Sequence, residues 1–112
     1  MSTALAQPLD RPVPHNADSE RVILGAIIID NRLIAQAIEL LNPEDFYVPS
    51  HRKIFKAMVE LFQRGSEIDP ILLGEELRKL GELESVGGIA AITNLTYGLP
   101  QIATLTTYAK LI

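Results

Sequence analysis

Apolar residues recur along this chain at the spacing of helices rather than strands. Between residues 33 and 41 they fall at positions i, i+1, i+4, i+5 and i+8, which places them on one face of a helix. The earlier run Val22–Ile29 is continuous and rich in β-branched residues, so by itself it is also compatible with a buried strand. Asn16 as an N-cap, followed by Asp18 and Glu20 in the first turn, favours a helix that is buried on most sides.

Capping and turn residues divide the rest of the chain into further helices. Ser50 is the expected N-cap of a third helix, Asp69 with Pro70 opens a fourth, and glycines follow the ends of several. Gly74 lies inside the fourth helix, where glycine costs roughly 1 kcal/mol relative to alanine. These signals predict an all-α fold, a compact bundle of about six short helices. The expected helices cover about residues 17–29, 33–41, 51–64, 70–80, 89–97 and 104–112, with one short turn at 43–45.

The two ends of the chain differ in pattern. Residues 1–14 contain three prolines and no apolar period, so they are predicted to be a flexible leader before a helical domain at 15–112. The last apolar stripe reaches the final residue without a glycine, proline or polar cap, so we expect more protein to follow.

An open apolar face of this kind is either a pairing surface or a core position that awaits further chain. We favour self-association. Tyr97 and Tyr108 lie at helix ends where a tyrosine ring can stay partly exposed, although packing at the rim of the core is the commoner outcome for a tyrosine beside an apolar stripe, so the final stripe is the better candidate. The candidate self-association or partner surface consists of Leu105, Tyr108, Ala109, Ile112 and Tyr97.

Composition narrows the class of protein. Hydrophobic residues make up 47% of the 112 residues but aromatic residues only 5%, so the core must be aliphatic. The absence of cysteine excludes disulfides and thiolate metal sites and fits a reducing compartment. A net charge of −4 argues against a domain that grips phosphates by itself. Since the longest apolar run is far shorter than the ~20 residues of a membrane helix, and no signal peptide opens the chain, a soluble cytoplasmic protein is expected.

No set of residues converges on a recognisable chemistry. The glycine-containing stretches 74–81 and 87–88 lack the lysine and hydroxyl residue of a phosphate-binding loop and are interpreted as helix ends. His15 and His51 have no partner one helical turn away, and we expect solvent or a neighbouring carboxylate to satisfy His51. The adjacent acids Glu44 and Asp45 are interpreted as favourable charges at a helix start. The sequence therefore predicts no catalytic, cofactor-binding or metal-binding residues.

Two charged groups are interpreted as solvent-facing. Arg52, Lys53 and Lys56 form the only local basic cluster, and DNA contact is the alternative to a solvated side of the third helix. Glu75–Glu76 and Arg78–Lys79 stand at i, i+3 and i, i+4 spacing and are expected to form a solvated face of the fourth helix.

The order of several short motifs resembles the N-terminal domain of DnaB-type replicative DNA helicases, and the resemblance spans about residues 13–112. Each motif is weak alone, but their order and gaps together are specific. This chain departs from the family pattern at Asp18–Val22, at Gly74, at Ala91 after the paired glycines and at Thr104. The motifs are Pro14-His15-Asn16, Val22-Ile23-Leu24-Gly25 with Asp30, residues 41–47, residues 51–58, Gly65 ahead of Ile68-Asp69, Gly81-Glu82-Leu83, Val86-Gly87-Gly88, Leu95, Pro100 and Tyr108-Ala109-Lys110.

The resemblance implies a division of labour. Family members join this helical domain through a linker helix to a RecA-like C-terminal ATPase domain, which is absent from this chain. The full-length protein is then expected to unwind duplex DNA with ATP and Mg, whereas these residues hold no cofactor. The N-terminal domains pair into a collar, a trimer of dimers, on a hexameric ring. The implied partners are other copies of the chain, primase and the helicase loader, with DNA bound mainly by the rest of the protein, and the last helix begins the hairpin that leads to the linker.

Two other functions are weighed against this one. The helicase-binding domain of bacterial primases has a related helical fold, so a helicase-binding module of a primase or another replication protein is the alternative. A small standalone helical enzyme is the third, and the lack of converging acid, base, nucleophile or metal ligands argues against it.

Overall fold

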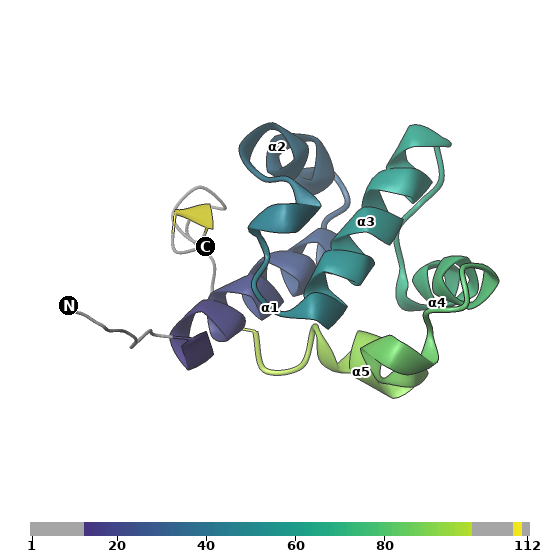
Figure 1. The fold of residues 1–112 in the computed structure, drawn as a ribbon. Helices are drawn as coiled ribbons and strands as arrows, with labels where there is room; N and C mark the ends of the chain where they lie inside the picture. Colours follow the sequence, from purple (N-terminus) through teal and green to yellow (C-terminus); the bar gives the residue numbers. More distant parts are fainter. Residues whose placement is uncertain (1–12, 100–108, 111–112) are drawn as a thin grey trace.

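The computed structural model describes residues 13–99 and 109–110, and every regular element within them is helical. Helix α3 packs against α1, α2, α4 and both short 3₁₀ turns, so it is the centre of the fold. Figure 1 shows α2 and α4 on opposite sides of α3. The predicted all-α class is therefore confirmed. In chain order the elements are α1 (Val13–Ile29), α2 (Leu33–Leu40), the 3₁₀ turn η1 (Pro43–Asp45), α3 (Pro49–Gln63), α4 (Pro70–Lys79), the 3₁₀ turn η2 (Glu84–Val86) and α5 (Gly88–Asn94).

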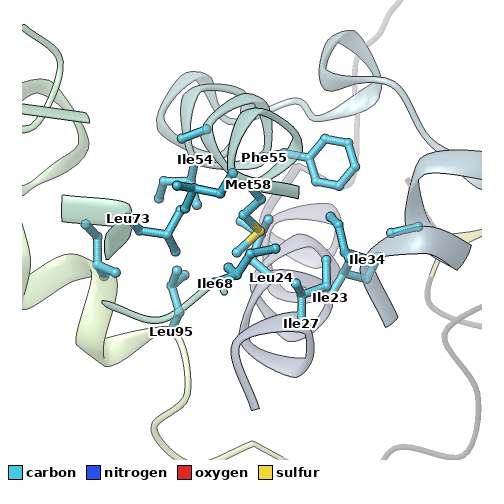
Figure 2. Packing of buried hydrophobic residues seen from close by; sticks show 14 of the residues in the cluster. Ile23, Leu24, Ile27, Ile34, Ile54, Phe55, Met58, Ile68, Leu73 and Leu95 are labelled. Carbon is cyan, nitrogen blue, oxygen red and sulfur yellow. The ribbon is translucent and has the colours of Figure 1, made fainter. Parts of the chain in front are cut away.

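The core is aliphatic, as the composition requires. Buried side chains of α1 and α3 face each other, and residues from the segments around α2, α4 and α5 close the cluster (Figure 2). The aromatic rings of Phe46 and Phe55 pack at a centroid distance of 5.0 Å. Central members of the cluster are Ile23, Leu24, Ile27, Ile34, Ile54, Phe55, Met58, Ile68, Leu73 and Leu95.

Helix starts agree with the capping signals in part. Asp69 caps α4 as predicted, because its carboxylate accepts a hydrogen bond from the Leu72 N–H at 2.7 Å. Helix α1 begins at Val13 rather than after Asn16, since Pro14 falls in the first turn, where its missing N–H costs nothing. Ser50 is not the N-cap of α3. That helix begins at Pro49 with Val48 as its N-cap, and a distant carboxylate binds there instead.

Glycines follow the ends of two helices, as predicted. Gly65 after α3 and Gly81 after α4 adopt positive φ values of 74° and 73°. Helix α5 is shorter than predicted and ends at Asn94. The predicted sixth helix at 104–112 lies outside the described residues except for Ala109–Lys110, and so do residues 1–12 of the predicted leader. In the described part of the chain, no helix is long and apolar enough to cross a membrane.

Gly74 has a packing role that its low helix propensity concealed. A Cβ at this position would collide with the Cδ1 atom of Ile89 on α5. The glycine thus lets an isoleucine of α5 rest directly on the backbone of α4, which offsets the roughly 1 kcal/mol that glycine costs in a helix.

Candidate functional site

The predicted surface residues fall into three situations. Tyr97 follows α5 and is 80% exposed, the most exposed large hydrophobic side chain in the described part of the chain. Ala109 is half-buried and packs against the core of the domain. Leu105, Tyr108 and Ile112 lie outside the described residues. Tyr97 is thus exposed rather than packed at the rim of the core, and the grouping of these residues into one surface stays a prediction.

The backbone around Tyr97 is held in place although its ring is exposed. The Arg21 guanidinium donates to the Tyr97 carbonyl at 3.1 Å and approaches the Leu95 carbonyl at 3.5 Å. The Tyr97 N–H donates to the Asn94 carbonyl at 3.1 Å. An exposed aromatic ring on a fixed turn loses little conformational entropy on binding, which is the usual property of an interface anchor.

A buried carboxylate organises the start of α3. Glu20 is 0% exposed, and its carboxylate accepts hydrogen bonds from the Tyr47 N–H at 2.5 Å and the Val48 N–H at 3.3 Å. His51 Nδ1 lies 2.7 Å from the same carboxylate. A negative charge is favoured at the N-terminus of a helix, so Glu20 serves α3 as a cap supplied by another helix.

The structure corrects our interpretation of Glu20 and supports that of His51. We expected Glu20 to stabilise the first turn of its own helix, but Glu20 lies in the middle of α1 and binds α3. A signal was available, since Glu20 shares the i, i+4, i+7 stripe of Leu24 and Ile27, a face that had to be buried. His51 has the neighbouring carboxylate that we expected. Among the described residues, no group of three His, Cys, Asp or Glu side chains is placed to hold a metal ion.

Asn31 makes a second long-range connection that sequence reasoning missed. Its amide nitrogen donates to the carbonyls of Ile27 and Ile68, both at 2.8 Å, and its amide oxygen accepts from the Ile68 N–H at 2.8 Å. One side chain thereby joins the end of α1 to the segment before α4. The sequence pattern at Asp30–Asn31 indicates only a break between helices.

Two of the three residues in the basic cluster bind within the domain. Arg52 donates to the carbonyls of Phe46 at 2.7 Å and Tyr47 at 3.1 Å. Lys53 donates to the Ser85 hydroxyl at 2.9 Å. These contacts favour a structural role over DNA contact for this side of α3.

The charged face predicted on α4 is only partly solvated. Glu75 and Arg78 form an exposed ion pair at 2.5 Å, and Arg78 lowers the pKa of the Glu75 carboxyl. Glu76, which we expected to be solvated as well, is 6% exposed and pairs with Arg64 at 2.5 Å. The hydrogen bond from Arg64 holds the pKa of Glu76 below its ordinary value, although burial opposes this shift. Glu76 therefore fastens α4 to the end of α3.

Two of the clefts on the described surface border residues discussed above. One of about 330 Å³ lies where the α1–α2 turn meets the end of α3, and its lining includes Asn31, Ile34, Phe62 and Ile68. A second of about 260 Å³ lies beside the start of α3 and includes Arg21, His51 and Leu95. The polar groups of both clefts that we have described bind other parts of the domain.

Comparisons with known proteins agree on one family. The family model of the DnaB-like helicase N-terminal domain matches residues 12–112. The replicative DNA helicase DnaC of Bacillus subtilis is 39% identical over 103 residues, which are 92% of this chain and 23% of that protein. The replicative DNA helicase DnaB of Treponema pallidum is 37% identical over 99 residues, or 88% of this chain and 23% of that protein. This chain thus spans under a quarter of the length of these curated relatives.

A solved structure is similar to this chain in its three-dimensional fold as well as in its sequence. The N-terminal domain of DnaB helicase from Mycobacterium tuberculosis superimposes with a TM-score of 0.79 and 30% sequence identity. The match covers 85% of this chain and 66% of that one. The arrangement of helices around α3 is therefore that of a known helicase domain.

Proposed function

The chain belongs to the family of DnaB-like helicase N-terminal domains, and on that premise we propose that it assembles and docks within a hexameric replicative helicase. The match along residues 12–112 is the observation that carries this proposal. It also decides against the alternative of a primase module. The full-length protein would unwind duplex DNA at the replication fork, in the cytoplasm.

We assign ATP and Mg binding, and ATP hydrolysis, to a RecA-like domain outside these 112 residues. This assignment is supported by how the described domain uses its buried and half-buried polar groups. Glu20, Asn31 and Glu76 each bind backbone or an arginine of another element, and so hold the fold together. A purified sample of this chain should show no ATP hydrolysis above buffer with Mg²⁺ present. ATP hydrolysis that copurifies with the chain, and that is lost when a surface residue of the chain is replaced, would oppose the assignment.

The self-association surface combines Tyr97 with the final stripe, Leu105, Tyr108, Ala109 and Ile112. Tyr97 supports this choice because its ring is exposed on a backbone held by Arg21. Replacing Tyr97 or Leu105 by serine should reduce the association of the chain by about tenfold, the loss of roughly 1.4 kcal/mol of interface energy. Tyr47→Ser is the matched control, since Tyr47 is an exposed tyrosine before α3. Light scattering over a concentration series distinguishes these variants, and equal behaviour of Tyr97→Ser and Tyr47→Ser would remove Tyr97 from the surface.

Docking of primase and of the helicase loader is the second half of the proposed function, with DNA bound mainly by the rest of the full-length protein. Titration calorimetry of this chain with the cognate primase tests it directly. The proposal predicts saturable binding that survives in Lys56→Ala, a change of one exposed cation. Absence of binding at about 100 µM of each protein, a concentration at which a dissociation constant of about 100 µM leaves over a third of each protein bound, would contradict the docking role.

A further inference from the structure

Two residues of α1, one helical turn apart, meet the chain where it leaves α5. Arg21 donates to the Tyr97 carbonyl at 3.1 Å and lies 3.5 Å from the Leu95 carbonyl. Gly25 lies under the same segment. A Cβ at Gly25 would collide with the Leu95 carbonyl oxygen and would lie 3.0 Å from the Cδ1 atom of Leu99.

The contact at Gly25 leaves little room for adjustment because it is made by backbone. Leu95 is the C-cap of α5 and is 4% exposed, so its carbonyl is fixed by a buried residue. The contact at Gly74 differs in kind, because only the tip of the Ile89 side chain stands in the way there. A side-chain tip can rotate into another staggered position, whereas a backbone carbonyl moves only if the chain around it moves.

The contact at Arg21 serves the same segment in a different way. The last carbonyls of a helix lack partners within the helix and need donors from elsewhere. Arg21 supplies such donors to the turn that follows α5, and Gly98 continues this turn with a φ of 65°. Residues 95–99 are thus held on α1 at two points. Their backbone approaches Gly25 closely, and the Arg21 guanidinium binds the Tyr97 carbonyl.

We infer that Arg21 and Gly25 form a saddle on α1 that sets the direction in which the chain leaves α5. The saddle fixes the backbone of residues 95–99, and with it the position of the exposed Tyr97 side chain. Ala109, further along the chain, packs against the core of the same domain. Arg21 and Gly25 are positioning residues, and this role stands whether or not the chain self-associates.

Distance measurement by pulsed electron paramagnetic resonance tests the saddle. The chain has no cysteine, so spin labels can be attached at two introduced cysteines, Gln63→Cys at the end of α3 and Lys110→Cys. Both positions are exposed. Diluting the labelled chain into unlabelled chain leaves only distances within one molecule. The labelled chain in which Arg21 and Gly25 are unchanged should give one narrow distribution of distances between the labels.

The variants separate a positioning role from simple destabilisation. Gly25→Ala should shift the mean distance by about 3 Å or at least double its width, because the Leu95 carbonyl must move. Arg21→Met should broaden the distribution, and Arg21→Lys, which keeps a cation that can donate, should restore part of the narrow peak. Gly74→Ala is the matched control and should leave the distribution unchanged.

Two results would overturn the inference. One is a broad distribution for the chain with its saddle intact. The other is an unchanged distribution in Arg21→Met, which alters a partly exposed residue and so tests the role even if Gly25→Ala does not fold. Urea unfolding of the same samples measures the stability of each variant, so a loss of stability can be distinguished from a change in the distance distribution.

Discussion

Replacing Glu20 by glutamine should destabilise the domain out of proportion to so small a change. The substitution keeps the shape of the side chain and removes its charge. The carboxylate of Glu20 is fully buried and receives two backbone N–H groups and His51 Nδ1 at 2.5, 3.3 and 2.7 Å. A glutamine offers one oxygen to these donors and turns its NH₂ group toward the others.

The magnitude follows from the hydrogen bonds that the glutamine amide is unable to accept. If the amide oxygen faces Val48 and His51, the NH₂ group opposes the Tyr47 N–H, which then has no acceptor. A hydrogen bond to a charged group contributes about 1.5–3 kcal/mol, and a buried donor left without a partner costs about 1–3 kcal/mol. We therefore expect a loss of about 3 kcal/mol, a large part of the roughly 5–15 kcal/mol that stabilises an ordinary domain.

Urea unfolding followed by circular dichroism measures this loss. With a slope of about 2 kcal/mol/M, the midpoint of Glu20→Gln should fall by about 1.5 M. Glu39→Gln removes an exposed acid of α2 and should change stability by less than about 0.5 kcal/mol. Equal midpoints for the two variants would refute the conclusion that Glu20 caps α3.

Three further predictions concern other contacts, and urea unfolding checks each. Asn31→Asp should cost about 2–4 kcal/mol, because a carboxylate oxygen would face the two carbonyls that now accept from the amide; a neutral effect would show that this side chain does not stabilise the junction. Gly74→Ala should be within about 1 kcal/mol of neutral, but in an Ile89→Ala background it should stabilise by about 1 kcal/mol, and the same effect in both backgrounds would contradict the contact. Since Arg64 lowers the pKa of Glu76 in the folded state, this pair stabilises above the ordinary glutamate pKa and loses that contribution as pH falls through the folded value. Stability should then decline less steeply from about pH 6 to about pH 3 in Glu76→Gln, and an unchanged slope would contradict the pairing.

Local signals in the sequence predicted most of the helical framework. Apolar stripes placed the helices, Asp69 marked the start of α4, and Gly65 and Gly81 marked two ends, because these features depend on neighbours within a turn or two. The composition correctly predicted an aliphatic core.

The errors arose where distant parts of the chain meet. Ser50 is a good local cap, but Glu20, some thirty residues earlier, lies where α3 begins and binds the free N–H groups. Glu76 looked solvated because its partner Arg64 belongs to another helix. The glycines of α1 and α4 could be counted in the sequence, but only the fold shows that Leu95 and Ile89 lie over them.

The candidate surface was predictable to a smaller extent. Tyr97 was named as a candidate from its place near a helix end, and the structure shows its side chain exposed, where packing at the rim of the core was the commoner expectation. The Arg21 contact that fixes its backbone joins residues 76 positions apart, and the local sequence pattern did not indicate it. Whether the remaining residues of the proposed surface form an interface depends on whether copies of the chain associate through the final apolar stripe.

Sedimentation velocity of the purified chain tests the central claim, that this domain exists to assemble. The account predicts that the weight-average sedimentation coefficient rises with concentration, from the value of a 12.3 kDa monomer toward that of a dimer. Samples from about 1 µM to about 500 µM cover the range in which an interface of ordinary size associates. A single monomeric boundary at every concentration would contradict the assembly role.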